Sequence, residues 1–138
     1  MTKMYSRVVA ALAAAFLMVG VAPVAQAADV TDDALAALAK DADAMAKAQK
    51  TFATTCASCH GPQGAGMVGP NLTDNFWLKG GKGTDIFKSI AEGAPAKGMP
   101  PMAPQLGGPD GVKNLAAYVL TLKGKNLPGK PPQGTEEK

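Results

Sequence analysis

Histidine and cysteine are scarce in this chain of 138 residues, which has one histidine, His60, and two cysteines, Cys56 and Cys59. A structural zinc site is closed by four ligands, most often Cys and His. One chain of this composition therefore cannot assemble a closed Cys/His metal site. For the same reason, no metal ion in it can be held between two histidines.

Concentrated positive charge is also missing. The formal net charge is +3, and Arg7, the only arginine, lies in an N-terminal leader together with Lys3. The lysines beyond that leader are nearly balanced by the 11 acidic residues. Nucleic acids and anionic membrane surfaces are bound through clusters of Lys and Arg, so we expect neither as the main partner.

Long hydrophobic runs are limited to the N-terminus. The uncharged apolar run 8–22 is short for a membrane span, and Pro23 follows it directly. Basic residues precede the run, and the small residues 25–27 follow it, which is typical of a secretory signal peptide. We predict that residues 1–27 are a cleavable signal peptide, that the mature chain is periplasmic, and that it does not insert stably into a membrane. An uncleaved N-terminal anchor is the alternative.

No run alternates strictly between apolar and polar residues, so we expect an all-α fold. Three stretches repeat apolar residues at helical steps, and each starts at a possible cap: 31–55 at Thr31, 84–92 at Thr84, and 110–123 at Asp110. The first stretch has no Gly or Pro and can form one helix or two. We predict three to five helices joined by long Gly/Pro loops.

The helical stretches define one domain over residues 28–124, with an N-terminal helical extension over 28–47. The apolar stripe of the extension is expected to pack into the core, and partner binding is the alternative. Residues 125–138 are mostly Lys, Pro, Gly and Glu, with little apolar content. We expect this segment to be a disordered tail.

Both cysteines and the histidine fall in one pentapeptide, Cys56-Ala57-Ser58-Cys59-His60. This C-x-x-C-H spacing is typical of the covalent attachment of one haem c. The two thiols can reach the two vinyl groups of one porphyrin, while the histidine serves as the proximal ligand of the iron. A redox-active dithiol or a simple disulfide is the alternative, although the flanks lack the βαβ pattern of dithiol enzymes.

With these motifs the chain resembles the monohaem class I c-type cytochromes over roughly residues 48–123, and this implies their small helical fold around one covalent haem. Phe52, four residues before Cys56, and the pair Leu115 and Tyr118 match positions where two helices of that family cross, with small Ala48 allowing close approach. Residues 71–81, 98–100 and 115–120 are similar to the haem c domains of oxidase-associated cytochrome subunits.

The resemblance also implies two further cofactor-binding residues. Gly69-Pro70-Asn71-Leu72 is similar to the family loop whose proline carbonyl accepts a hydrogen bond from the haem histidine, so Pro70 is expected to orient His60. Trp77 is expected to pack beside the haem and to donate its N–H to a propionate. Plain core packing is the alternative role of Trp77.

The second axial ligand has to be Met, Lys or nothing, because His60 is the only histidine. Gly98-Met99-Pro100 lies in a rigid proline-rich loop and resembles the axial-methionine loop of the family. We predict that His60 and Met99 ligate the iron. Met102, Lys97 or an open position are the alternatives.

A His/Met-ligated iron has no vacancy for substrate, so we expect outer-sphere electron transfer and no catalysis. The predicted function is that of a monomeric, periplasmic, single-haem electron carrier. Its donor and acceptor would be redox proteins such as a membrane oxidase or a periplasmic reductase. The alternatives are a haem c subunit of a larger redox enzyme complex, and a gas-binding or catalytic haem with an open distal site.

Four lysines are candidates either for steering acidic partners or for an ordinary solvated face: Lys79, Lys82, Lys88 and Lys97.

Overall fold

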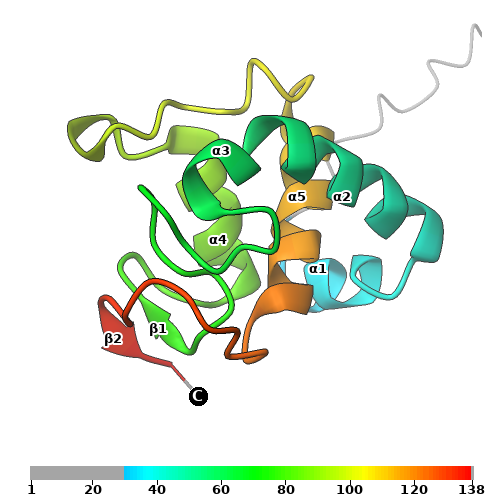
Figure 1. Cartoon of the computed structure of the whole chain (residues 1–138). Helices are drawn as coiled ribbons and strands as arrows, with labels where there is room; N and C mark the ends of the chain where they lie inside the picture. Colours follow the sequence, from blue (N-terminus) through cyan, green and yellow to red (C-terminus); the bar gives the residue numbers. More distant parts are fainter. Residues whose placement is uncertain (1–29, 138) are drawn as a thin grey trace, which may run out of the picture.

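A computed structural model describes residues 30–137 of the chain. Within them lie five α-helices, α1 (Asp32–Leu38), α2 (Ala42–Thr55), α3 (Ala57–His60), α4 (Gly83–Glu92) and α5 (Pro109–Leu122), and a 3₁₀ turn, η1 (Pro95–Lys97). Two short strands, β1 (Phe76–Trp77) and β2 (Thr135–Glu136), form an antiparallel pair. Helix α5 runs through the centre, and long loops connect the other elements around it (Figure 1). The all-α fold with long Gly/Pro loops is confirmed.

The stretch 31–55 forms two helices, because a second cap stands inside it. The Thr31 hydroxyl accepts a hydrogen bond from the backbone N–H of Ala34 at 3.1 Å and starts α1, as predicted. The Asp41 carboxylate does the same for Ala44 at 3.0 Å and starts α2. An Asp at an N-cap satisfies backbone donors that a continuous helix would engage internally, so it favours a break without Gly or Pro.

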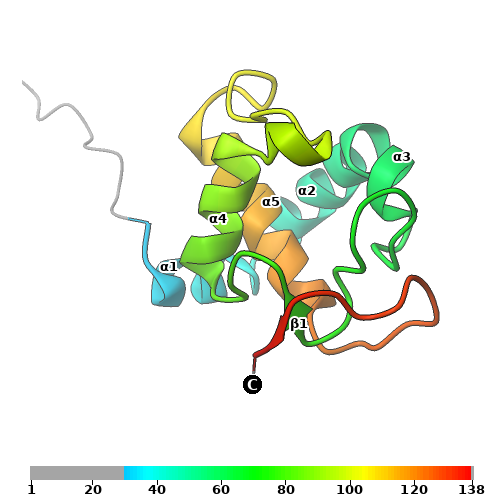
Figure 2. The ribbon, with the colours of Figure 1, turned by 90° about the vertical axis from the view of Figure 1, so that its left-hand side faces the viewer.

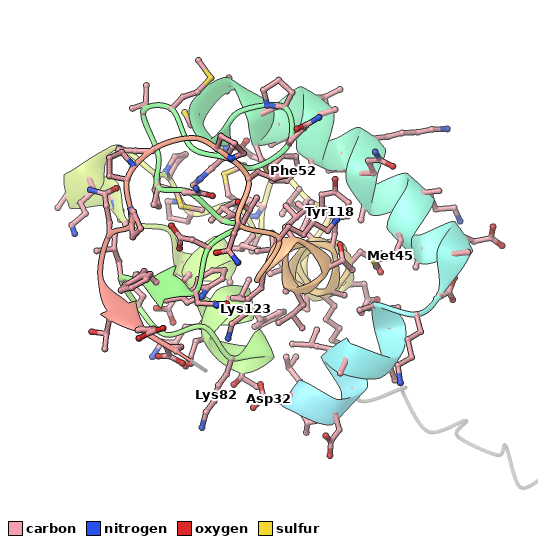
Figure 3. All side chains as sticks on the ribbon, turned by 60° about the horizontal axis from the view of Figure 1, so that its bottom comes forward. Asp32, Met45, Phe52, Lys82, Tyr118 and Lys123 are labelled. Carbon is pink, nitrogen blue, oxygen red and sulfur yellow. The ribbon has the colours of Figure 1, made fainter. Side chains whose placement is uncertain are left out.

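The core surrounds α5 and includes residues of α1, α2, β1 and α4, with one part of it where α2 crosses α5. Ala48 and Phe52 of α2 are buried, as are Leu115 and Ala116 of α5. The ring centroids of Phe52 and Tyr118 lie 5.3 Å apart, and the ring planes make an angle of 54°, which is a favourable tilted geometry (Figure 3). The small side chains at this crossing let the two helix backbones approach, and each large apolar side chain buried there contributes roughly 1.5–3 kcal/mol.

Two predicted caps are wrong, and both errors have local causes. Helix α4 begins at Gly83, and Thr84 donates its backbone N–H and its hydroxyl to Oδ1 of Asp32, at 2.8 and 2.9 Å. A residue distant in sequence therefore caps this helix, and Asp32 lies beside its first turn (Figure 3). Helix α5 begins at Pro109, whose fixed φ suits the first helical position, so Asp110 lies inside the first turn.

The expectation of a disordered tail over 125–138 is wrong for the residues that the structure describes. The segment 125–137 runs beside the loop that follows α3 (Figures 1 and 2). Backbone N–H groups of Asn126, Lys130 and Glu137 donate to the carbonyls of Thr73, Ala65 and Asn75, and β2 pairs with β1. The bonds are between backbones, so low apolar content does not prevent them, and prolines in the segment lower the entropy lost on ordering.

Among residues 30–137, no helix is long and apolar enough to cross a membrane. The predicted signal peptide, residues 1–27, lies outside the described residues.

Candidate haem-binding site

The Cys-x-x-Cys-His motif forms a single helical turn. Helix α2 ends at Thr55, and Cys56 is both its C-cap and the N-cap of α3. The N–H groups of Cys59 and His60 both donate to the Cys56 carbonyl, at 3.1 and 2.9 Å. Gly61 ends the turn with a φ of +82°, a conformation that glycine adopts without strain. Both cysteines are free thiols. The turn therefore presents two thiols and one imidazole from a rigid piece of backbone.

The His60 ring is fixed by the loop that follows it. Its Nδ1 lies 3.0 Å from the carbonyl oxygen of Pro70. Because a carbonyl only accepts, Nδ1 carries the proton and donates, which leaves a lone pair on Nε2. Burial lowers the pKa of His60, the Pro70 carbonyl raises it, and the charge of Lys130 lowers it, with the net direction downward. The structure thus brings Pro70 to the expected position and holds a neutral imidazole ready to bind a metal.

Gly69 packs directly against the His60 ring. A Cβ added at Gly69 would lie 2.7 Å from Cε1 and 2.9 Å from Nδ1 of His60. The Gly69 N–H also donates to the Cys59 carbonyl at 2.8 Å, so the loop is pinned to the motif. The sequence pattern predicted a role for Pro70 and none for Gly69, although the glycine stands directly before it in the same four-residue motif.

The motif opens onto a cavity of about 790 Å³ whose lining is mostly apolar. Helices α2, α4 and α5 supply apolar walls, the segments 68–80 and 93–105 supply most of the remainder, and Lys130 and Gln133 of the C-terminal segment complete it. All six predicted site residues line this one cavity: Cys56, Cys59, His60, Pro70, Trp77 and Met99. Cofactor sites are typically concave, apolar and of this size, with a few polar groups that fix orientation.

Cys56 has the wrong acidity for a redox-active dithiol. Burial, and to a lesser degree the nearby Cys59, raises the pKa of Cys56 to about 11. Dithiol oxidoreductases depend on a thiolate whose pKa lies well below the ordinary value. The cavity-facing thiol pair thus suits covalent attachment to a bound group better than thiol exchange.

Met99 and Met102 both line the cavity from the loop between α4 and α5. Met99 is held by a tight bridge, in which the N–H of Ala94 donates to its carbonyl at 2.8 Å and its own N–H donates back at 3.2 Å. Gly98, with a φ of +84°, makes the turn between them. Met102 is the more buried of the two, at 8% exposed, and its N–H donates to the Ile90 carbonyl.

Trp77 closes another part of the cavity wall. The side chain is 9% exposed, and its Nε1–H is buried without a hydrogen-bond partner among residues 30–137. A buried N–H of this kind costs free energy unless an acceptor meets it. An apolar cavity with two thiols, an available imidazole lone pair and this N–H fits a haem c.

Lysines around the cavity differ from the four expected at its edge. Lys79 and Lys97 line it, whereas Lys82 and Lys88 are not among its lining residues. The Lys79 ammonium donates to the Gly93 carbonyl at 2.8 Å and so ties the Trp77 loop to the base of the methionine loop. Lys130 also lines the cavity. This position was not expected, because Lys130 lies in the segment predicted to be disordered.

A small helical domain with this thiol and imidazole turn, a carbonyl-bound histidine and an apolar cofactor cavity is a c-type cytochrome domain. Comparison with known proteins agrees and goes further. The chain belongs to the family described as cytochrome c oxidase, cbb3-type, subunit III, whose model matches residues 43–119. Membership of this family means that the cofactor of the chain is haem c, and it assigns the chain to the proteins of respiratory electron transport.

Two relatives illustrate the extent of the similarity. The cbb3-type cytochrome c oxidase subunit CcoP of Rubrivivax gelatinosus is 52% identical over 89 residues, which cover 64% of this chain and 29% of that protein. Subunit FixP of Azorhizobium caulinodans is 37% identical over 106 residues, covering 75% and 36%. The chain thus spans about a third of the length of these curated relatives.

A solved structure shows the same fold. The crystal structure of cytochrome cL from the marine methylotrophic bacterium Methylophaga aminisulfidivorans matches with a TM-score of 0.57 and 28% sequence identity. The match covers 62% of this chain and 57% of that one.

Proposed function

We propose that this chain works as the haem c part of a respiratory oxidase assembly, bound to a membrane oxidase and passing single electrons to it. The observation that carries the proposal is the match of residues 43–119 to a family of oxidase subunits, with relatives that are themselves named as such subunits. These comparisons favour the complex-bound alternative raised from the sequence over its main prediction, a freely moving carrier.

In this proposal each site residue has a distinct task. Cys56 and Cys59 would hold the haem through thioether bonds, and His60 would bind the iron through Nε2 while Pro70 keeps its ring oriented. Met99 would supply a thioether ligand, and Trp77 would donate its Nε1–H to a propionate. The bound haem supplies the one-electron chemistry. A thioether ligand favours the reduced iron, and two filled axial positions leave no room for a substrate, so we infer that the chain carries electrons and catalyses no reaction of its own.

Exposed apolar side chains beside the cavity suit the approach of a redox partner. Val68 is 78% exposed and Leu78 is 45% exposed, and both also line the cavity. Exposed apolar side chains that form a contiguous patch are typical of a contact surface. Electrons transferred there would travel a short path between the haem and the partner.

Co-purification tests the proposal. An affinity-tagged full-length chain is expressed in a host that exports it, attaches haem and makes a cbb3-type oxidase, and membranes are solubilised in mild detergent. We expect the oxidase to be recovered with the tagged chain. Because Val68 and Leu78 also line the cavity, haem attachment in a Val68→Lys plus Leu78→Lys variant is checked by its absorption spectrum, and the haem-loaded variant is expected to recover less oxidase. Recovery of haem-loaded chain without oxidase, from the periplasmic fraction, would instead support the freely moving carrier.

A further inference from the structure

The C-terminal segment 125–137 lies beyond the part of the chain that matches the family, which ends at residue 119. Nevertheless it packs on the loop that serves His60. In both Figure 1 and Figure 2 the orange to red segment follows the green loop after α3. The loop and the segment therefore form one structural unit, although some 60 residues of sequence separate them.

Lys130 is the residue of this segment with the most bonds to the loop. Its backbone N–H donates to the Ala65 carbonyl at 2.9 Å, and its ammonium donates to the Val68 carbonyl at 2.8 Å. Its own carbonyl accepts a longer bond of 3.4 Å from the Asn71 amide. These contacts bracket the Gly69-Pro70 turn, which is the element that fixes the His60 ring.

The Lys130 ammonium also brings a positive charge to the cavity. Lys130 is half-buried and lines the same cavity as His60. The ion pair within residues 30–137 joins Lys113 and Asp110, so no carboxylate of this part of the chain pairs with Lys130. The bond between the Lys130 ammonium and the Val68 carbonyl is exposed, so the charge acts on the cavity through partly screened surroundings.

We propose that Lys130 is a positioning residue for the haem ligand: its side chain fixes the Val68–Pro70 turn that orients His60, and its charge raises the reduction potential of the iron. The inference rests on the proposed binding of haem at this site. A haem iron becomes less positive when it gains an electron, so a nearby positive charge favours the reduced form. A unit charge at about 10 Å changes the equilibrium constant for reduction roughly 2- to 15-fold in surroundings between water and protein interior.

The test uses three variants of the haem-loaded full chain. Lys130→Met removes the charge and the bond but keeps the length of the side chain, and Lys130→Arg keeps the charge and a donor. Lys125→Met is the matched control, because Lys125 lies on the same segment and is exposed. The reduction potential is measured by spectroelectrochemical titration, and native-state hydrogen exchange is measured at the amides of Gly66 and Gly69, which donate to His60 and Cys59.

We expect Lys130→Met to lower the equilibrium constant for reduction by roughly 2- to 15-fold and to speed exchange at both amides. Lys130→Arg should stay near the wild type in both measurements, and Lys125→Met should leave both unchanged. A wild-type potential in Lys130→Met, an equal shift in Lys125→Met, or a loss in Lys130→Arg as large as in Lys130→Met would each overturn the inference. Haem attachment is measured first, and its absence from the wild type would contradict the proposed function itself.

Discussion

Replacing Gly69 by alanine is the sharpest test of whether the contacts of Gly69 and Pro70 orient the His60 ring. The new Cβ would lie 2.7 Å from Cε1, 2.9 Å from Nδ1 and 3.0 Å from Nε2 of the ring, which is closer than real Cβ contacts allow. The ring cannot yield freely, because Nδ1 is bonded to the Pro70 carbonyl at 3.0 Å. The loop cannot yield freely either, because the Gly69 N–H is bonded to the Cys59 carbonyl. Overpacking of this kind costs about 1–3 kcal/mol.

The assay is denaturant unfolding of the haem-loaded protein, with the absorption spectrum and the reduction potential measured on the same samples. Gly107→Ala is the control. Gly107 has a φ of +75°, and a Cβ added there would meet no atom within 4 Å, so alanine costs about 1–2 kcal/mol through its backbone alone. We expect both substitutions to lower the free energy of unfolding by similar amounts. Only Gly69→Ala is expected to alter the absorption spectrum and the reduction potential. A Gly69→Ala protein with wild-type stability, spectrum and potential would refute the argument.

Three further predictions concern other parts of the molecule. Met99→Ala should abolish the weak far-red absorption band of sulfur-ligated ferric haem, whereas Met102→Ala should keep it; the reverse result would make Met102 the ligand. Trp77→Phe should lower the free energy of unfolding of the haem-loaded protein by about 1.5–3 kcal/mol, measured in denaturant, because the proposed hydrogen bond from Nε1–H to a charged haem propionate would be lost. Asp32→Ala should cost about 1 kcal/mol by uncapping α4. Hydrogen bonds from the Thr84 N–H and hydroxyl lower the pKa of Asp32 from 3.8. A carboxyl whose pKa is lower in the folded than in the unfolded protein stabilises the fold at pH values above its unfolded pKa. The difference in free energy of unfolding between wild type and Asp32→Ala should therefore be complete at neutral pH. It should shrink as the pH falls below 3.8 and through the pKa of Asp32 in the folded protein.

Two kinds of sequence information predicted the central features of the site. The C-x-x-C-H spacing predicted one turn that presents its three functional side chains together, and the resemblance of residues 69–72 to a family loop implied the hydrogen bond from His60 to Pro70. The helices around Phe52, Ile86 and Leu115 followed from apolar spacing. These features depend on residues that are close in sequence or on patterns with a fixed period.

Features that depend on backbone bonds between distant segments could not be predicted in this way. Composition gave no sign that Lys130 and its neighbours would bond to the carbonyls of the loop after α3, because any residue except proline offers the same backbone N–H. The Asp32 cap of α4 and the Lys79 bond to Gly93 likewise join residues whose proximity only the fold decides. The choice of Met99 as axial ligand stays a prediction.

The hydrogen bond between His60 and Pro70 bears on the speed of electron exchange. An electron moves readily only when few atoms must shift as the charge changes. Here the imidazole is held by a backbone carbonyl in a loop that is itself bonded to Cys59 and to Lys130. In the proposed haem site, a histidine held in this way would keep one orientation in both oxidation states, so little nuclear rearrangement would be needed on its side of the iron. Loosening the clamp should therefore raise the reorganisation energy, and slow self-exchange, even where the driving force for transfer is unchanged.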